Sequence, residues 1–189
     1  MKLLPFQPGS SAEVGESLAH AVGRALLENL DRLYATAHRL TGRADVAEDL
    51  VQETARKALR AAPALKDRRN LRAWLFTILV NAARDHLRRD LPWGTDPGDP
   101  AEAAALNADP ESIARIAAED VRRAVAQLTP AHRAAVLLVD LEEFTIAEAA
   151  QMLKLPPGTV ASRLARAHRA LRDLLQAYAA RSSQSGGRP

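Results

Sequence analysis

The residues of this chain best suited to chemistry are arginines near its C-terminal end. Residues 155–172 contain no acidic residue. Within them, four arginines recur at three-residue spacing: Arg163, Arg166, Arg169 and Arg172. On a helical wheel these side chains spiral across the surface left exposed by an apolar stripe made of Val160, Leu164, Ala167, Leu171, Leu174 and Leu175. Because arginine can bind guanine through two hydrogen bonds, the pattern predicts a helix that reads DNA. The competing interpretation is a solvated arginine face on an ordinary bundle helix.

A capped turn precedes this helix. Thr145 followed three residues later by Glu148 is a capping box, which predicts the start of a short helix. Residues 154–158 then form a turn, and Thr159 opens the last helix, which we expect to reach about Tyr178. A short helix, a tight turn and a longer arginine-bearing helix are typical of a helix-turn-helix. We predict that five residues contact DNA: Thr159, Ser162, Arg163, Arg166 and Arg169.

A second candidate surface mixes aromatic, amide and basic side chains over residues 70–89. Its members are Trp74, Phe76, Asn81, Arg84, Asp85, His86, Arg88 and Arg89. Unpaired bases stack on aromatic rings and pair with amides while arginines hold the phosphates, so this set suits single-stranded DNA. By itself, Trp74 would more often be a core residue and His86 a surface histidine.

A third candidate surface is acidic. Its polar members are Asp45, Glu48, Asp49, Gln52 and Glu53, and they lie next to Leu50 and Val51. Such a face would repel DNA, so it is either solvated or meets a basic protein partner. Metal binding by these carboxylates is the weaker reading, because acidic pairs four residues apart are routine on helix surfaces.

The elements that must position these surfaces are all helical. Apolar residues recur at steps of three and four in a stripe made of Leu26, Leu30, Leu33, Ala37 and Leu40, and Thr41–Gly42 ends that helix. Further helices are predicted from about 45 to before Pro63, over 70–89, over 112–127 and from Pro130 to Leu141. Apolar residues make up 47% of the 189 residues and aromatic residues only 4%, which favours helices over a sandwich or barrel.

The chain divides at residues 92–111. This stretch has four prolines, two glycines, five acidic residues and no Lys or Arg, so it cannot form a continuous helix. We therefore predict an all-α fold with two small helical domains, at 18–91 and 112–178, joined by a flexible acidic linker. The second domain contains the helix-turn-helix. Residues 1–17 and 179–189 are predicted to be disordered ends.

Several classes of function are disfavoured. The chain has no cysteine, no phosphate-binding glycine loop and no His-Glu-x-x-His motif, and its five histidines are scattered. We therefore expect no enzymatic activity, no metal and no cofactor. No apolar run approaches a membrane span and the N-terminus lacks a signal peptide, so we expect a cytoplasmic protein without membrane insertion.

Three segments together resemble a known family. They are AEDLVQETARKAL, LRAWLFTILVNAARDHLRR and LTPAHRAAVLLVDLEEFTIAEAAQMLKLPPGTVASRLARAHRAL. In this order they are similar to extracytoplasmic-function sigma factors of bacterial RNA polymerase, over about residues 22–91 and 112–176. The resemblance implies that 18–91 is sigma domain 2 and 112–178 is sigma domain 4, and that the chain directs promoter-specific transcription initiation.

The resemblance also implies roles for the candidate surfaces. The acidic helix, with Asp45, Glu48, Asp49, Leu50, Val51, Gln52 and Glu53, would dock on the β′ coiled coil of core RNA polymerase. Trp74, Phe76, Asn81, Arg84, Asp85, Arg88 and Arg89 would recognise the −10 element and help to melt it. The helix-turn-helix would read the −35 element through Thr159, Ser162, Arg163, Arg166 and Arg169, while its other side holds the β flap. Members of the family are often held inactive by an anti-sigma factor. Ala161 stands where the family commonly has Lys or Arg, so we expect one −35 contact to be missing.

Other classes explain less of the sequence. A stand-alone helix-turn-helix regulator would explain residues 145–175 but neither the aromatic-basic nor the acidic surface. A helical adaptor such as an anti-sigma factor would lack the basic face of the last helix.

Overall fold

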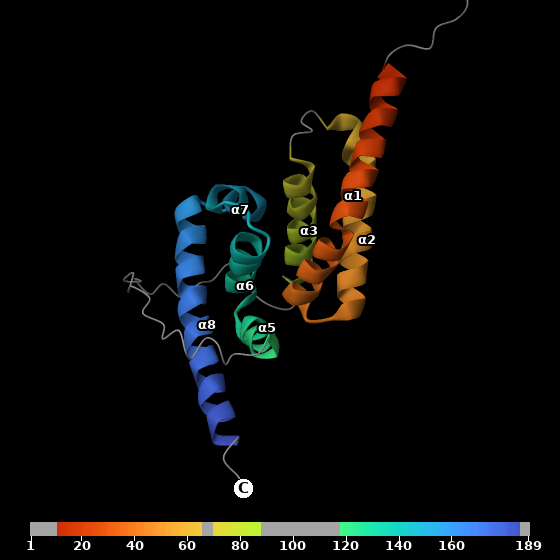
Figure 1. Ribbon diagram of the computed structural model, residues 1–189. Helices are drawn as coiled ribbons and strands as arrows, with labels where there is room; N and C mark the ends of the chain where they lie inside the picture. The colour runs from red at the N-terminus through yellow and green to blue at the C-terminus, as the bar shows by residue number, and fades with distance from the viewer. Residues whose placement is uncertain (1–10, 66–69, 88–117, 186–189) are drawn as a thin grey trace, which may run out of the picture.

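A computed structural model of the chain describes residues 11–65, 70–87 and 118–185, and the side chains of residues 18–65, 70–87 and 118–179. Every regular element in these ranges is helical, which confirms the predicted fold class (Figure 1). The first group comprises α1 (Ser11–Thr41), α2 (Ala44–Ala61), the 3-10 turn η1 (Ala62–Ala64) and α3 (Leu71–Leu87). The second comprises α5 (Ala118–Gln127), α6 (Pro130–Val136), the π-helical turn η2 (Leu137–Leu141), α7 (Ile146–Leu153) and α8 (Pro157–Ser185).

Helix α1 ends where the sequence predicts. Gly42 adopts a left-handed backbone with φ of 70°, which glycine tolerates because it has no Cβ. Its N–H donates to the His38 carbonyl at 2.7 Å, and the Thr41 hydroxyl donates to the Ala37 carbonyl at 2.9 Å. The chain therefore reverses over two residues, and α2 runs back alongside α1 (Figure 1).

The three helices of the first group bury one face each. The large side chains that are fully buried here include Leu33, Leu40, Leu75 and Leu79. The prediction that Leu30 belongs to the buried stripe of α1 is wrong, because this residue is 44% exposed. The buried face of α1 also includes Val22, Ala25 and Thr36, so it is centred further round the helix than the prediction and leaves Leu30 at its edge.

The second group contains the predicted helix-turn-helix. The Glu148 N–H donates to the Thr145 hydroxyl at 3.2 Å and the Thr145 N–H donates to the Glu148 carboxylate at 2.9 Å, which confirms the capping box. Lys154 ends α7 in a left-handed conformation with φ of 56°. Helix α8 then begins at Pro157, two residues before the predicted Thr159, since proline is well suited to a first helical turn.

The ends of the helical regions differ from the prediction. Helix α1 begins at Ser11, so residues 11–17 are helical although we expected an irregular N-terminus up to residue 17. Helix α8 continues to Ser185, beyond the predicted end near Tyr178. The predicted linker at 92–111 and the first part of the predicted helix at 112–127 lie outside the described residues. In the part that the structure describes, no helix has the length and apolar character needed to cross a membrane.

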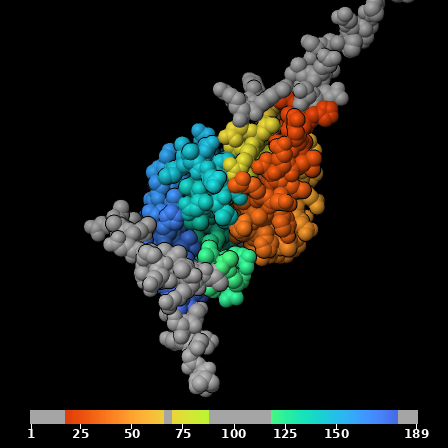
Figure 2. Space-filling view, viewed as in Figure 1, coloured from red at the N-terminus to blue at the C-terminus, as the bar shows by residue number. Residues whose placement is uncertain are grey.

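The two groups of helices pack directly against each other (Figures 1 and 2). Phe144, just before α7, meets Phe76 of α3 edge to face, with ring centroids 5.2 Å apart. One core cluster includes Val80 of α3 together with Met152 of α7. The two predicted domains therefore share a hydrophobic core in this conformation.

Candidate nucleic-acid interface

The outward side of α8 carries most of the residues predicted to read duplex DNA. Arg169 is exposed, while Thr159, Ser162 and Arg166 are half-buried. The Ser162 hydroxyl donates to the Thr159 carbonyl at 3.0 Å, so its oxygen can still accept a hydrogen bond. Because Ser162, Arg166 and Arg169 follow at steps of four and three, they share one side of the helix.

Arg163 does not belong to this outward side, and its prediction as a DNA contact is wrong for this conformation. The residue is only 4% exposed, and its Nε and Nη1 have no hydrogen-bond partner among the described residues. The reason is helical phase: Arg163 lies three residues after Val160 and four before Ala167, both of which are completely buried. The predicted stripe was centred too close to Leu164, which is half-buried.

The aromatic-basic helix α3 is also split between two sides. Phe76 is completely buried against Phe144 and cannot stack on a base in this conformation, which corrects its prediction. Trp74, Asn81 and Asp85 lie on another side of the helix, at spacings of seven and four residues. Of these, Asp85 is exposed and Trp74 and Asn81 are half-buried. Arg88 and Arg89 lie outside the described residues.

Both polar atoms of the Asn81 amide take part in hydrogen bonds. Its Nδ2 donates to the Thr77 carbonyl at 2.6 Å, and its Oδ1 accepts from Arg84 Nη2 at 2.9 Å. Arg84 Nη1 also donates to the Leu153 carbonyl, at the end of α7, at 3.3 Å. One N–H and one oxygen lone pair of the amide remain for a base, so Asn81 can pair with a base without displacing Arg84. Arg84 connects α3 to the second group of helices.

Most polar residues of the predicted acidic face of α2 are exposed, but its two aliphatic residues are not. Leu50 and Val51 are buried, so their prediction as partner contacts is wrong for this conformation. They belong to the core-facing stripe of α2, which also contains Val46, Thr54 and Ala58. The face that remains exposed consists of Asp45, Glu48, Asp49 and Gln52.

Local basic residues balance part of this acidic face. Arg43 Nε donates to the Asp45 carboxylate at 3.2 Å, and this hydrogen bonding holds the pKa of Asp45 below its ordinary value. Glu53 is half-buried and forms ion pairs with Arg56 and, at 3.2 Å, with Lys57. Glu48 and Asp49 are thus the outward carboxylates in the middle of the face. Among the described residues, no group of three acidic or histidine side chains is placed to hold a metal ion.

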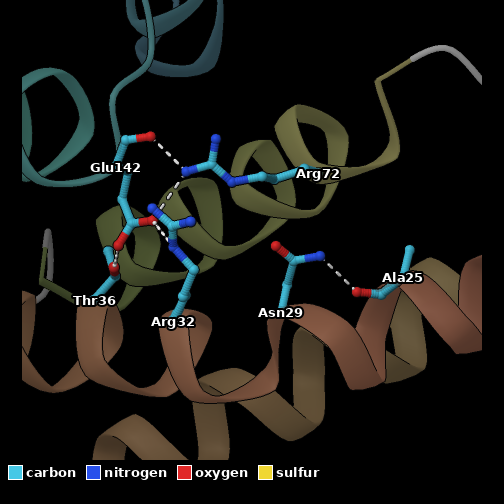
Figure 3. Close-up of polar contacts among 6 residues, drawn as sticks. All are labelled: Ala25, Asn29, Arg32, Thr36, Arg72 and Glu142. Carbon is cyan, nitrogen blue, oxygen red and sulfur yellow. Dashed lines mark hydrogen bonds and ion pairs between the residues drawn. The ribbon is translucent and has the colours of Figure 1, made fainter.

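A buried carboxylate between the two groups of helices was not predicted (Figure 3). Glu142 is 3% exposed. It accepts from Arg32 Nε at 2.9 Å, from the Thr36 hydroxyl at 2.9 Å and from Arg72 Nη2 at 3.1 Å. The Arg72 guanidinium also lies over the Phe144 ring, 4.2 Å from its centroid. No local pattern announces this cluster, because the hydrogen-bond partners of Glu142 lie 70 to 110 positions away in the sequence.

A second contact between the groups centres on Arg133 of α6. Its Nη1 donates to the carbonyls of Leu40 at 3.0 Å and Arg39 at 3.4 Å, at the C-terminal end of α1. Its Nε and Nη2 donate to the carbonyls of Val125, at 3.1 Å, and Leu128, at 2.9 Å, near the end of α5. The charged guanidinium thus lies among the last carbonyls of α1 and α5. It donates hydrogen bonds to carbonyls that have no partner within their own helix, and its charge interacts favourably with the negative ends of the helix dipoles. Burial lowers the pKa of the Arg133 guanidinium.

Comparison with known proteins matches each of the two groups of helices to a family model. The Sigma-70 region 2 model matches residues 26–91, and the Sigma-70 region 4 model matches residues 118–171. The chain is 37% identical over 150 residues to the ECF RNA polymerase sigma factor EcfG of Rhodopseudomonas palustris, which covers 79% of this chain and 82% of that protein. It is also 37% identical over 162 residues to the ECF RNA polymerase sigma factor SigL of Mycobacterium tuberculosis, covering 82% and 90% of the two chains.

Solved structures are similar over most of the chain. The sigma factor RpoE of Bartonella quintana, in complex with the anti-sigma factor NepR, matches with a TM-score of 0.62 and 30% identity, covering 82% of this chain and 96% of that one. CnrH, in complex with the cytosolic domain of CnrY, matches with a TM-score of 0.63 and 25% identity, covering 88% and 95%.

The helical bundle of the first group and the helix-turn-helix of the second thus match region 2 and region 4 of a sigma factor. The chain belongs to the extracytoplasmic-function sigma factors of RNA polymerase, and it directs promoter-specific transcription.

Proposed function

We propose that the outward side of α8 reads the −35 element and that α3 captures the −10 element. The observation that carries the first assignment is the two-sidedness of α8: Val160 and Ala167 are buried, while Arg169 is exposed and Arg166 and Ser162 share its side. An α-helix fits the major groove of DNA, where arginine can distinguish guanine from other bases. Arg166 is the residue assigned to a base edge, and Thr159 and Arg169 are assigned to the backbone.

The −10 element is assigned to the side of α3 that carries Trp74, Asn81 and Asp85. A ring and an amide on one side of a helix suit an unstacked base, because the ring stacks and the amide pairs with a base edge. Arg84 is next to Asn81 and would contact a phosphate once Asn81 is occupied by a base. Capture of unpaired bases stabilises the melted strand, so the same side of α3 assists melting.

Core RNA polymerase is the partner assigned to the acidic face of α2, through the coiled coil of its β′ subunit. Exposed Glu48 and Asp49 suit a basic protein surface, and such complementarity speeds association and orients the docked chain. The other side of the helix-turn-helix would bind the β flap. Catalysis belongs to the polymerase, and the sigma factor works beside it in the cytoplasm.

An anti-sigma factor is a further partner that we assign to this chain. The proposal is supported by the solved structure of RpoE, which is described in complex with the anti-sigma factor NepR. CnrH is likewise described in complex with another protein, the cytosolic domain of CnrY.

The test is transcription in vitro with core polymerase and a promoter library. We expect promoter-specific transcripts only when the chain is added, and weak binding of duplex DNA by the chain alone. A chain that binds one duplex sequence tightly without polymerase, and does not support transcription, would instead be a stand-alone helix-turn-helix regulator.

A further inference from the structure

Helix α1 carries a second apolar stripe, on the side that its own core does not use. Leu27, Leu30 and Tyr34 are exposed, although their spacing of three and four residues places them on one side of the helix. Gly23 continues this stripe by one turn. We call Gly23, Leu27, Leu30 and Tyr34 the outer seam. Helix α1 runs along the outer surface of the first group of helices, so its exposed side is open to a partner (Figure 2).

The fold of a single chain does not require the outer seam. Leu27 is 76% exposed, more than any other large apolar side chain among the described residues. Glycine inside a helix is less stable than alanine, yet a Cβ added to Gly23 would meet nothing within 4 Å. Exposed apolar side chains in line with a glycine that the chain itself does not need indicate that the surface of a partner packs closely here.

The spacing of the outer seam is symmetric. Its residues are separated by four, three and four positions, so the spacing is the same from either end. In an antiparallel pair of identical helices, the register that places Tyr34 opposite Gly23 of a second copy also places Leu27 opposite Leu30 of that copy. The space above each Gly23 then receives a tyrosine ring, and the leucines fill the centre. A seam of this kind suits the packing of two helices side by side.

The charges beside the outer seam are complementary in the same register. Arg24 directly follows Gly23 and Asp31 directly follows Leu30, so both lie on one edge of the seam, two turns apart. Both side chains are exposed, and neither forms an ion pair with a described residue. In a two-fold symmetric antiparallel pair, the same edges lie side by side, so each Arg24 comes within about 3 Å, measured along the helix, of the opposite Asp31. Such reciprocal ion pairs select the partner and its direction more than they add affinity.

We propose that the outer seam joins two copies of this chain in an antiparallel, two-fold symmetric dimer. Symmetric dimers use the same patch on both subunits, and this seam is complementary to itself in both spacing and charge. A uniformly basic partner, of the kind assigned to the acidic face of α2, would be repelled by Arg24. Each copy contributes mainly one helix, so the dimer is weak and reversible.

The dimer is compatible with the fold of each copy. Arg32 and Thr36, which bind Glu142, lie on the opposite side of α1 from the outer seam. The second group of helices therefore keeps its place when α1 pairs with a second copy. The inference concerns the free chain and does not depend on the proposed function.

The experiment measures the mass of the full chain against its concentration by sedimentation equilibrium. We expect a monomer–dimer equilibrium with a dissociation constant on the order of 10 μM. Leu27→Ser removes the most exposed leucine of the seam from both copies and should weaken the dimer at least about tenfold. The matched control is Leu141→Ser, because Leu141 is exposed to nearly the same degree as Leu30 but lies outside the seam. This control should leave the dissociation constant unchanged.

Charge exchange tests the register and the symmetry. Arg24→Asp and Asp31→Arg each place like charges opposite one another at both contacts, so each variant alone should dimerise about tenfold more weakly than the parent. An equimolar mixture of the two variants should dimerise again. One contact then joins the two introduced residues, and the other joins the native Arg24 and Asp31. A mixture that dimerises no better than either variant alone would overturn the proposal.

Gly23→Gln separates the outer seam from the stability of the helix. Glutamine favours a helix more than glycine does and its Cβ meets nothing, so the Tm of the dilute chain should not fall. The same side chain fills the space that receives Tyr34 of the second copy, so dimerisation should weaken about tenfold. Circular dichroism must show unchanged helix content in every variant.

Three outcomes would overturn the proposal. The first is a parent chain that stays monomeric at every concentration. The second is a dimer that Leu27→Ser does not weaken. The third is a monomeric parent in which Leu27→Ser weakens binding to core polymerase, because the polymerase would then be the occupant of the outer seam.

Discussion

Arg163 offers a sharp test of which side of α8 meets DNA. The residue is an arginine on the packed side of the helix, between Val160 and Ala167, and its Nε and Nη1 are buried without hydrogen-bond partners among the described residues. A buried donor without an acceptor costs about 1–3 kcal/mol of desolvation free energy. Methionine has a similar length, no donor and a flexible chain that adapts to an irregular space.

We therefore expect Arg163→Met to raise the free energy of unfolding by about 1–3 kcal/mol, because it removes two unpaired donors while keeping the packing. For a chain of 189 residues whose two halves share a core, each kcal/mol corresponds to a shift of roughly 2–4 °C in Tm. Urea unfolding followed by circular dichroism measures the change. Arg163→Met should also leave the salt dependence of holoenzyme binding to promoter DNA unaltered, because the side chain does not reach a phosphate.

The matched control is Arg169→Met, which removes the same charge from the exposed side of the same helix. An exposed change of this kind usually alters stability by less than about 0.5 kcal/mol. It should reduce the slope of log affinity against log salt by about one unit. The reasoning about helical phase fails if Arg163→Met destabilises the chain, or if it lowers the salt slope as much as Arg169→Met does.

Three further predictions concern the other surfaces. Arg166→Ala should cost about 1–3 kcal/mol at one −35 position and relax base preference there, whereas Arg172→Ala should weaken all promoters equally; binding of the holoenzyme to a −35 library separates the two. Asp49→Arg should weaken binding to core polymerase with little change in thermal stability, and normal affinity in the folded variant would contradict the role of the acidic face. Thr145→Ala should lower the free energy of unfolding by about 1 kcal/mol because it removes the hydroxyl of the capping box, which thermal unfolding can measure against Thr41→Ala.

Local chemistry in the sequence predicted the elements well. A hydroxyl followed three residues later by a carboxylate can satisfy two helix-end donors wherever it occurs, so Thr145 and Glu148 marked the start of α7 without further information. In the same way, Gly42 marked a helix end because only glycine adopts a left-handed backbone without steric cost. The capping box and the glycine helix end each depend on a few neighbouring residues. Each therefore marks a helix boundary whatever packs around it.

The phase of each helix was less predictable. The helical wheel predicts that Arg163 lies on the surface left by the apolar stripe, but Val160 and Ala167 place its side chain toward the core. Similarly, Phe76 was assigned to base stacking because of its neighbours in sequence, although it lies one turn after Arg72, on the side that meets the second group of helices. A wheel orders residues around a helix, but the centre of the buried face depends on which other helices pack there.

Contacts between the halves lie beyond any local pattern. Glu142 reads in sequence as one of two adjacent surface glutamates, yet Glu142 is buried and Glu143 is exposed. The difference comes from Arg32, Thr36 and Arg72, whose positions relative to Glu142 are set only when the two groups of helices meet. A buried carboxylate whose side-chain donors all come from the other half is satisfied only while the two halves are in contact, so no pattern within one half can reveal it.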